Sequence, residues 1–313
     1  MQYSYSSLDR KALVRASGAD AASFLQGQFG NDVAALDGNH YQLNCYANPK
    51  GRLLSVFRIY QAGDDYYLCM PDDIIDATVQ RLKMFVLMAK VNFEVLRDSW
   101  AVLGVWGEDS EQALAGSLGG ELPANAGEKT QMDACRVLRI DDDVPRFEIH
   151  GPLEDINALA AKLGAAGNRL DQEQWQLREI LCGTPTVYTQ TREEFVPQMA
   201  NLDLVGGLSF KKGCYPGQEI VARMHYLGNL KRRMYLLNMA GNTLPLPGDA
   251  LISASTSANA GKVVDAARSE DGRIYLLAVL TIKDAESGGM QLASDANAEL
   301  AIESLPYSLE KAS

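Results

Sequence analysis

Apolar residues recur at helical spacing in some segments of the chain and gather into short runs in others. From Asp72 or Asp73 to about Val86, the side chains of Ile74, Ile75 and Val79 share one face, which predicts a helix. Comparable patterns predict helices at 18–30, capped by Asp20, and at 110–118, 153–163, 172–181 and 218–226. Short apolar runs bounded by turn residues predict strands at 41–46, 53–60, 66–70, 91–96, 101–106, 136–140 and 146–149.

From residue 234 onward the pattern changes to short strands separated by Gly, Pro and Asp turns. Runs at 234–239, 250–253, 261–266, 274–282 and 300–302 have strand length, and their close spacing is typical of a small antiparallel barrel or sandwich. The segments before them alternate strands and helices, and the second of these, from about 100 to 170, has the order β-α-β-β-α. The sequence therefore predicts the α+β class with a C-terminal all-β part.

The composition is that of an ordinary soluble chain. Its 313 residues suffice for two or three domains, with 47% hydrophobic and 22% charged residues. There is no run of 18 apolar residues, and the N-terminal segment lacks the basic and apolar regions of a signal peptide. Five scattered cysteines, an odd number, argue against a disulfide framework and favour a reducing compartment. We therefore expect a cytoplasmic, monomeric protein without a membrane partner.

Several kinds of site have no motif in this chain. There are three histidines and neither C-x-x-C nor H-x-x-x-H, so no metal site is predicted, and the cysteine spacing does not match a resident iron–sulfur cluster. Phosphate-binding loops, dinucleotide fingerprints and the G-x-S-x-G element are also missing from the sequence. The net charge of −11 disfavours broad attraction to nucleic acid, so we expect no direct nucleic-acid binding.

The most specific signal is the segment 211–219, Lys-Lys-Gly-Cys-Tyr-Pro-Gly-Gln-Glu. Gly213 and Gly217 allow backbone angles that a side chain would forbid, so they can present Cys214 on a tight loop. The two preceding lysines and the N-terminus of the following helix favour the thiolate form of this cysteine. The segment therefore predicts a reactive thiol, and a buried structural cysteine in a Gly/Pro turn is the alternative.

Charge is distributed unevenly around this segment. Between 211 and 233 there is one acidic residue, Glu219, whereas the basic residues number six: Lys211, Lys212, Arg223, Lys231, Arg232 and Arg233. On an acidic chain, this local reversal predicts a site for a small or extended anion. A solvated basic face is the alternative.

The segment 211–219 resembles the K-G-C-Y-x-G-Q-E signature of the YgfZ family. These folate-binding proteins are connected with iron–sulfur cluster work and tRNA modification, and they are related to the glycine-cleavage T protein, a folate-dependent aminomethyltransferase. The resemblance extends to residues 196–198, 201–202 and 206–210, and near the start of the chain to 24–28, 31–33 and 49–52. It thus spans nearly the whole sequence.

The resemblance implies a fold of three units arranged in a ring around a folate pocket. Residues 1–98 together with 171–233 would form an α+β folate-binding unit that carries the cysteine loop. Residues 99–170 would form a second α+β unit, and 234–313 would form an antiparallel β-barrel.

The resemblance also implies residues for binding tetrahydrofolate or a derivative. Trp175 falls where the family carries a tryptophan implicated in folate binding, and core packing is its alternative role. The family's other implicated aromatic would fall on the strand 11–14, where Lys11 stands instead, either meeting a carboxylate or simply solvated. The residues assigned to the ligand are Trp175, Lys11, Lys212, Tyr215, Gln218, Glu219, Arg223, Lys231 and Arg232.

Two departures from the T protein argue against aminomethyl transfer. Its catalytic aspartate would fall in the strand after Gly51, near Ser55, yet no carboxylate occurs from Gly51 to Gly63. Aminomethyl transfer needs an anion to organise the amine and to stabilise developing positive charge, which a serine cannot do. The glutamate expected for the pterin edge would fall near Leu181, with Glu179 the nearest acid.

Three functions follow as hypotheses. The first is a folate-binding accessory protein that supports assembly or repair of iron–sulfur clusters in client enzymes and, through them, tRNA modification. Its ligand would be folate, including polyglutamylated forms, and its thiol would be Cys214. The second is a folate-dependent aminomethyl or one-carbon transferase, and the third is an interaction scaffold with an inert thiol. The missing aspartate favours the first over the second, and whether the chain catalyses any reaction stays open.

Overall fold

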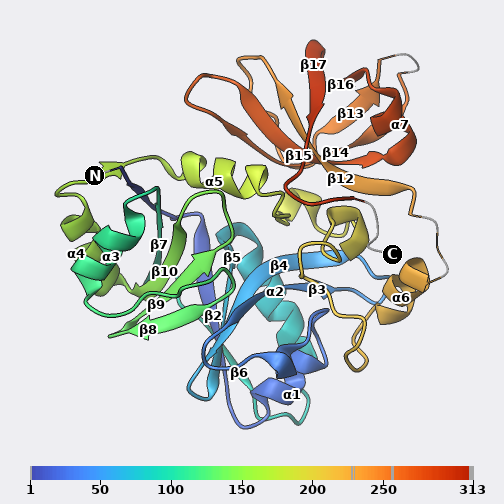
Figure 1. Cartoon of the computed structure of the whole chain (residues 1–313). Coiled ribbons are helices and arrows are strands. Elements are labelled where there is room, and N and C mark those ends of the chain that lie inside the picture. Colours follow the sequence, from blue (N-terminus) through green and yellow to red (C-terminus); the bar gives the residue numbers. More distant parts are fainter. Residues whose placement is uncertain (1, 227, 229, 255–256, 310–313) are drawn as a thin grey trace. The chain divides into compact units, whose positions relative to one another are not determined.

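The computed structural model describes residues 2–226, 228, 230–254 and 257–309 (Figure 1). The chain divides into two compact units. Unit 1 comprises 1–26, 33–42 and 57–175, and unit 2 comprises 27–32, 43–56 and 176–313. The chain therefore passes between the units after residues 26, 32, 42, 56 and 175. Residues 1, 227, 229, 255–256 and 310–313, which the predicted three-part division includes, lie outside the described residues, and that division stays a prediction.

The first sheet of unit 1 has six strands in the order β11-β1-β7-β10-β9-β8. Their bounds are β1 (Ser4–Ser7), β7 (Trp100–Trp106), β8 (Lys129–Met132), β9 (Cys135–Ile140), β10 (Arg146–Pro152) and β11 (Asn168–Arg169). Neighbouring strands are antiparallel except β1 and β11, which are parallel. Helices α3 (Ser110–Leu118) and α4 (Leu153–Leu163) pack together, and α4 packs on β7 and β10. Both helices have the predicted bounds.

The second sheet has the order β3-β4-β5-β2-β6. Its strands are β2 (Lys11–Ser17), β3 (Tyr41–Ala47), β4 (Leu53–Ala62), β5 (Asp65–Pro71) and β6 (Asn92–Val95), and the chain passes between the two units within β3 and within β4. Helix α2 (Asp72–Met84) packs on β2, β5 and β6 through its buried Ile74, Ile75, Val79 and Leu82. This is the apolar face that the helical spacing predicted.

The prediction for 18–30 was too long. Helix α1 covers only Ala21–Gln26, and the 3-10 turn η1 (Val33–Ala35) follows it. Asp20, predicted to cap this helix, directs its carboxylate to another segment, where it accepts a hydrogen bond from the backbone N–H of Lys90 at 2.7 Å. After the helix the chain packs closely on β3, where a Cβ placed on Gly30 would lie 2.6 Å from the Sγ of Cys45.

Unit 2 contains a closed antiparallel barrel in the order β12-β15-β14-β13-β16-β17, which confirms the predicted C-terminal barrel. Its strands are β12 (Arg232–Met239), β13 (Ala250–Ser253), β14 (Asn259–Arg268), β15 (Ile274–Thr281), β16 (Met290–Leu292) and β17 (Asp295–Glu303). Val263, Leu276, Ala278 and Leu280 are among the buried residues that fill its interior. The short helix α7 (Ile282–Ser287) was not predicted; the hydroxyl of Thr281 accepts a hydrogen bond from the N–H of Asp284 at its start.

The segment between β11 and the first barrel strand, β12, carries the remaining elements. These are α5 (Gln172–Leu181), the 3-10 turns η2 (Thr189–Thr191) and η3 (Pro197–Ala200), and α6 (Gln218–Tyr226). The bounds of α5 and α6 match the prediction, and α5 ends before Gly183, which has a positive φ of 66°. Among the described residues, no helix combines the length and the apolarity that crossing a membrane would require.

Candidate functional site

The cysteine loop of residues 211–219 lies in unit 2 against the turn that joins β3 to β4. Gly217 has a φ of +83°, and a Cβ on it would lie 2.4 Å from the carbonyl oxygen of Asn48 and 2.8 Å from the nitrogen of Gly51. Only glycine fits this approach, as predicted. Gly213 differs from the prediction: its φ is not positive, and a Cβ there would meet nothing within 4 Å.

Lys212 anchors this loop from inside. Its ammonium donates hydrogen bonds to the carbonyl oxygens of Phe29 at 2.6 Å and Asn31 at 3.0 Å. Burial lowers the pKa of Lys212 to about 8, and the nearby carboxylate of Asp32 opposes this shift. Lys212 is near Cys214 in the sequence, yet its ammonium is directed at two main-chain carbonyls. Its role is to hold the loop on the segment before β3.

Cys214 itself is exposed, in contrast to the other thiols. Cys45, Cys69 and Cys135 are buried and Cys182 is half-buried. Burial raises the pKa of Cys45 to about 12 and also raises those of Cys69 and Cys135, so the thiolate form is disfavoured at all three. Of the five thiols, all within the described residues, Cys214 is the one that solvent reaches most freely.

The side chain of Tyr215, which follows Cys214, points into the protein. Tyr215 is buried, and the Nζ of Lys212 lies 5.3 Å from the centre of its ring. Burial raises the pKa of Tyr215, and its hydroxyl has no hydrogen-bond partner within the described part of the chain. Gln218 donates weakly to the carbonyl of Lys212 at 3.5 Å, and Glu219 is exposed in the first turn of α6.

The predicted basic cluster separates into internal and surface cations. Arg233 is buried and forms an ion pair with Asp203, with N–O distances of 2.6 and 3.0 Å, so like Lys212 it is engaged inside the protein. Lys211, Arg223 and Lys231 are exposed and Arg232 is half-buried. Four of the six cations therefore reach solvent and could meet an anion.

Trp175, the residue assigned to folate, lies in the core of unit 1. Only 2% of its surface is exposed, and a Cβ on Gly104 would lie 2.3 Å from its ring, so the indole occupies the space that this glycine leaves open. The guanidinium carbon of Arg146 lies 4.9 Å from the ring centre and the Nζ of Lys11 lies 5.7 Å from it. The indole N–H is buried without a hydrogen-bond partner among the described residues.

Lys11 meets a carboxylate, which is the first of the two alternatives raised for it. Its Nζ lies 2.7 Å from Oε2 of Glu148, and an Nη of Arg58 lies 2.9 Å from the same oxygen. On the other carboxylate oxygen, Nε2 of His150 lies 2.9 Å from Oε1. The Oη of Tyr60 lies 3.2 Å from the second ring nitrogen of His150. Lys11 and Trp175 are therefore neighbours around a buried ionic network.

The network fixes the charge of its members. Burial alone would raise the pKa of Glu148, but the Arg58 and Lys11 cations and the His150 hydrogen bond hold it well below its usual range. Burial lowers the pKa of His150, with Lys11 and Arg58 adding to the effect. An ionised Glu148 only accepts hydrogen bonds, so a neutral His150 carries its proton on Nε2 and accepts from Tyr60.

The same residues include a grouping of metal-ligand types. Atoms of Cys69, Glu148 and His150 lie within 4.8 Å of one another. However, both oxygens of Glu148 already accept from cationic or N–H groups, and burial raises the pKa of Cys69. Two adjacent cations would also repel a metal ion. We interpret the grouping as part of the ion-pair network.

The sequence pattern did carry a signal for this network that was missed. Arg146, Glu148 and His150 occupy every second position of β10, so they share one face of the strand. Phe147 and Ile149 point to the opposite face and join the core beneath α4. Three ionisable residues with period two in an otherwise apolar strand indicate a buried polar layer.

Two further buried groups bear on the chemistry of unit 2. Ser55 on β4, where the resemblance places a catalytic aspartate, is fully buried, and its hydroxyl has no hydrogen-bond partner in the described residues. Asp265 on β14, which the sequence did not single out, is buried beside a register shift in the barrel. It accepts from Nε2 of Gln176 at 2.5 Å and from the hydroxyl of Tyr188 at 3.0 Å. Burial raises its pKa to about 7.

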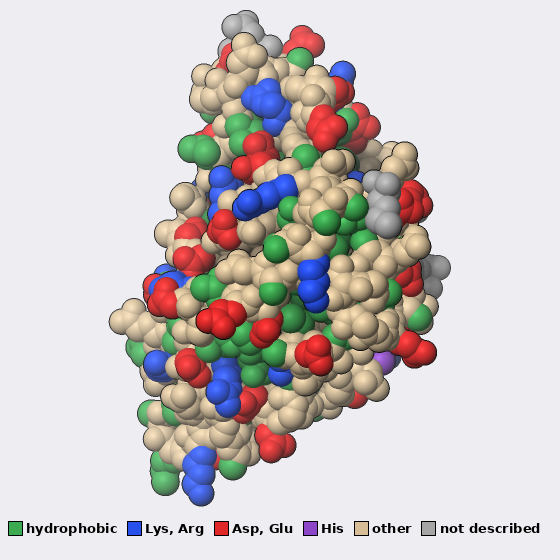
Figure 2. All heavy atoms as spheres, turned by 90° about the vertical axis from the view of Figure 1, so that its left-hand side faces the viewer, with side chains coloured by type: hydrophobic (Ala, Val, Ile, Leu, Met, Phe, Trp, Pro, Cys, Tyr) green, Lys and Arg blue, Asp and Glu red, His purple; other side chains and the backbone are tan. Residues whose placement is uncertain are grey.

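The surface view adds one observation about charge. Figure 2 shows a face on which Lys and Arg side chains are interspersed with Asp and Glu rather than gathered into a continuous basic tract. On this face, therefore, the cations do not form the continuous tract with which proteins neutralise several phosphates together.

Comparison with known proteins agrees with this architecture. No protein-family model matches the chain. A protein named tRNA-modifying protein YgfZ from Yersinia pseudotuberculosis serotype IB (strain PB1/+) is 32% identical over 305 residues, which cover 97% of this chain and 92% of that protein. The protein of the same name from Shigella boydii serotype 4 (strain Sb227) is 32% identical over 306 residues, covering 97% and 93%.

Among solved structures, the glycine cleavage system aminomethyltransferase T from Bartonella henselae aligns with a TM-score of 0.75 at 14% identity, covering 97% of this chain and 86% of that one. The two sheets with their packed helices, together with the closed barrel, thus define a protein with the glycine-cleavage T-protein fold. At 32% identity across nearly the whole length, the chain belongs to the YgfZ family.

Proposed function

We propose that this chain is a folate-binding accessory protein that supports iron–sulfur cluster assembly or repair and, through client enzymes, tRNA modification. The relatives named tRNA-modifying protein YgfZ support the last of these roles, and the resemblance stated above supports the folate and iron–sulfur roles. The fold of an aminomethyltransferase without the carboxylate of that chemistry supports binding in place of group transfer.

The observation that carries the proposal is the contrast between Ser55 and Cys214. The first is a fully buried neutral group at the position where a transferase of this fold would need an anion. The second is an exposed thiol on a loop held by Lys212 and by the close approach of Gly217. At the position of Ser55 the described structure therefore offers no anion to stabilise a developing cation, whereas Cys214 presents a nucleophilic atom to solvent.

In this proposal Trp175 contributes through its indole N–H. The ring is held in the core by Arg146 and Gly104, and the N–H is a buried donor without a partner among the described residues. A folate oxygen or nitrogen that accepts from it would satisfy that donor.

A titration with tetrahydrofolate, followed by tryptophan fluorescence, tests the folate role. Wild type should show a saturable change, and Trp175→Phe should lose most of that change and weaken binding about tenfold, because a buried hydrogen bond is lost. Trp100→Phe is the matched control and should bind normally. Normal binding by Trp175→Phe would remove the indole N–H from the site, and no binding by wild type would refute the folate role.

A second measurement tests the thiol. Cys214→Ala should fold normally yet fail to support iron–sulfur enzyme activity in cells that lack the native factor, whereas Cys182→Ala should support it. Full rescue by Cys214→Ala would remove the thiol from the mechanism. Formation of methylenetetrahydrofolate and ammonia from an aminomethylated lipoyl carrier protein would instead restore the transferase hypothesis.

A further inference from the structure

The end of α2 presents an apolar tip to solvent, residues 84–88, Met-Phe-Val-Leu-Met. The exposed fraction is 68% at Met84, 42% at Phe85, 86% at Leu87 and 95% at Met88. Single exposed apolar residues are common on protein surfaces, but four large ones within five positions are typical of a surface that meets a partner. The tip follows α2 and precedes β6 in unit 1 (Figure 1), and none of the functions above uses it.

Hydrogen bonds at both ends hold the tip in place. On the helix side, the N–H of Phe85 donates to the carbonyl of Leu82 at 3.0 Å. On the strand side, Asp20 accepts from the backbone N–H of Lys90 at 2.7 Å, and its own N–H donates to the carbonyl of Lys90 at 3.2 Å. A Cβ on Gly18 would lie 2.2 Å from that carbonyl, so this contact needs glycine. The apolar side chains are therefore presented on a braced turn, which a partner does not have to order first.

Cations flank the tip on both sides. From 77 to 93 the chain carries Arg81, Lys83 and Lys90 and no acidic residue, although its net charge is −11. The side chains of Lys83 and Lys90 are exposed. The guanidinium carbon of Arg81 lies 5.7 Å from the centre of the Phe85 ring, so this cation lies beside the apolar surface itself. Apolar side chains framed by cations suit a partner that is apolar inside and anionic at its surface.

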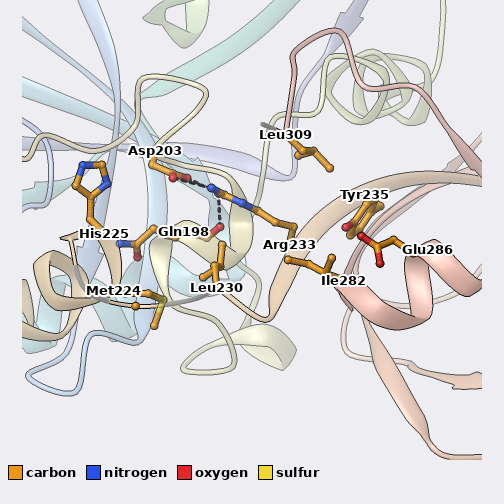
Figure 3. A pocket seen from close by; sticks show the side chains of 11 residues that line it. Gln198, Asp203, Met224, His225, Leu230, Arg233, Tyr235, Ile282, Glu286 and Leu309 are labelled. Atoms are coloured by element: carbon orange, nitrogen blue, oxygen red, sulfur yellow. Dashed lines mark hydrogen bonds and ion pairs between the residues drawn. The ribbon is translucent and has the colours of Figure 1, made fainter. Parts of the chain in front are cut away.

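The arginine in the cavity of unit 2 differs from these cations because it is already paired. Arg233 donates to both carboxylate oxygens of Asp203, at 2.6 and 3.0 Å, and to the main-chain oxygen of Gln198 at 2.8 Å (Figure 3). This bidentate pairing leaves little capacity for another anion. An anionic partner is therefore better met by the exposed lysines of the tip than by this cavity.

Size and shape favour a membrane over a protein as that partner. The four exposures together equal about three whole residues, on the order of 600 Å² at about 200 Å² each, whereas a standard protein interface buries roughly 800 Å² per partner. A second copy of the chain would bring two sets of cations together. A lipid surface needs neither a larger area nor a matching groove, because headgroups and acyl chains close around an inserted tip.

We propose that residues 84–88 insert into the interface of an anionic phospholipid membrane. The four apolar side chains would enter the boundary between headgroups and acyl chains, while Lys83 and Lys90 would pair with lipid phosphates. The contact would be peripheral and reversible, because a few inserted side chains, like a single acyl chain, give only marginal affinity. The lack of an 18-residue apolar run led us to expect no membrane partner, but such a run is needed to span a bilayer and not to lie on its surface.

Flotation of the full chain with lipid vesicles tests the inference. At physiological ionic strength a Debye length of about 8 Å screens the acidic remainder of the chain. Vesicles of equal parts phosphatidylcholine and phosphatidylglycerol should bind the protein roughly tenfold or more tightly than phosphatidylcholine alone, and high salt should narrow the difference. No flotation with either kind of vesicle would overturn the proposal, and equal binding to both would overturn the role of the lysines.

Variants of the apolar side chains locate the contact. Leu87→Gln should weaken binding to both kinds of vesicle roughly fivefold, and adding Met88→Gln should bring the loss to roughly tenfold or more. Both side chains are exposed, so these substitutions keep the test independent of folding. Leu246→Gln, at a residue of unit 2 that is 64% exposed, is the matched control and should bind like the wild type. Unchanged binding by the double variant would exclude the tip as the contact.

Variants of the lysines test the charge. Lys83→Gln combined with Lys90→Gln should remove most of the preference for the anionic vesicles, whereas Lys50→Gln combined with Lys283→Gln, at two exposed lysines of unit 2, should keep it. An unchanged preference in the first pair would contradict the proposal. Sedimentation velocity without lipid should show a monomer. A dimer that Leu87→Gln dissociates would assign the tip to a second copy of the chain and overturn the lipid contact.

Discussion

Each unit of the protein buries one carboxylate of particular interest, and the two are held in opposite ways. In unit 1, Glu148 is surrounded by Lys11, Arg58 and His150. In unit 2, the hydrogen-bond donors to Asp265 among the described residues are all neutral: the amide of Gln176, the hydroxyl of Tyr188 and the backbone N–H of Ala266. Burial raises the pKa of a carboxyl in both places, but only at Glu148 do cations outweigh it. Burial alone therefore does not decide the charge of a carboxyl.

The two carboxylates give opposite dependences of stability on pH. The pKa of Glu148 is depressed in the folded state, so its contribution is present above its unfolded pKa and is lost as pH falls through the folded value. The lowered pKa of His150 acts in the same direction. The pKa of Asp265 is raised from 3.8 to about 7, so the folded state is penalised increasingly as pH rises between these values. Acid should weaken unit 1, and neutral pH should weaken unit 2.

The largest effect is expected for Glu148→Gln. Removing this charge leaves the buried Arg58 and the partly exposed Lys11 beside a neutral amide, which should lower the free energy of unfolding by about 3–5 kcal/mol. Urea denaturation at pH 7 measures it, with the exposed Glu154→Gln as the control, for which a change within about 0.5 kcal/mol is expected. A loss under about 1 kcal/mol would show that the network is not what stabilises unit 1.

Asp265→Asn should have the next largest effect, and of the opposite sign. At about 1.4 kcal/mol for each pKa unit, the variant should gain roughly 2–3 kcal/mol over wild type between pH 5 and pH 8. Asparagine keeps the shape of the side chain but only one acceptor oxygen, so it loses a hydrogen bond either from Tyr188 or from the N–H groups of Gln176 and Ala266, a loss that is the same at both pH values and leaves the pH-dependent difference intact. Urea denaturation at the two pH values gives the difference. A gap that does not change with pH would mean that Asp265 stays ionised in the folded state.

Lys11→Met sharpens the comparison because it makes the surroundings of Glu148 less cationic and so more like those of Asp265. One of its two cations is removed while Arg58 stays, so the pKa of Glu148 should rise and unfolding in acid should begin at higher pH. Because the Lys11 side chain is partly exposed, we expect a loss of about 1–2 kcal/mol at pH 7. An acid titration followed by fluorescence measures the midpoint. No shift of this midpoint would assign the lowered pKa to Arg58 and His150 alone.

The smallest effect is expected at the surface, where solvent screens charge. Lys231→Ala combined with Arg232→Ala should weaken polyglutamylated folate roughly several-fold, because exposed ion contacts contribute about 0.2–1 kcal/mol each. Monoglutamyl folate should lose less, and the gap should close at high salt. Equal losses for both ligands would place these residues elsewhere than at the folate tail. Tight, salt-sensitive tRNA binding abolished by the same pair would show direct contact with tRNA.

The sequence predicted much of the fold where local signals are strong. Helices α3, α4, α5 and α6 have their predicted bounds, and the closed barrel confirms the reading of the short strands after residue 233. Strands β1, β8, β11 and β16, two to four residues long, were missed because so few positions seldom show a period, although β6 and β13, also four residues long, were predicted. The helix predicted for 18–30 was overextended because packing of Gly30 against Cys45 overrides helical propensity.

Features of the site could be predicted from the sequence only where they depend on residues that are close together in the chain. The need for glycine at 217 follows from the turn chemistry of the loop itself. The hydrogen bond from the Lys212 ammonium to Phe29 could not be predicted in this way, because Phe29 lies 183 positions away in the chain. Side chains that are neighbours in sequence also often point in different directions. Lys11 and Glu148 are likewise 137 positions apart, so their pairing could be raised only as an alternative.

The route of the chain between the two units has a consequence for synthesis on the ribosome. Unit 2 needs residues 27–32 and 43–56 as well as 176–313. Its first segments emerge before the whole of 57–175 and then wait for their partners, a delay on the order of ten seconds at about 5–20 residues per second. During that time the unit 2 parts of β3 and β4 lack the loop anchored by Lys212. The contacts of the cysteine loop can thus form only after the whole of 57–175 has been synthesised, and truncated chains that end near residue 175 would lack the loop that packs on the turn between β3 and β4.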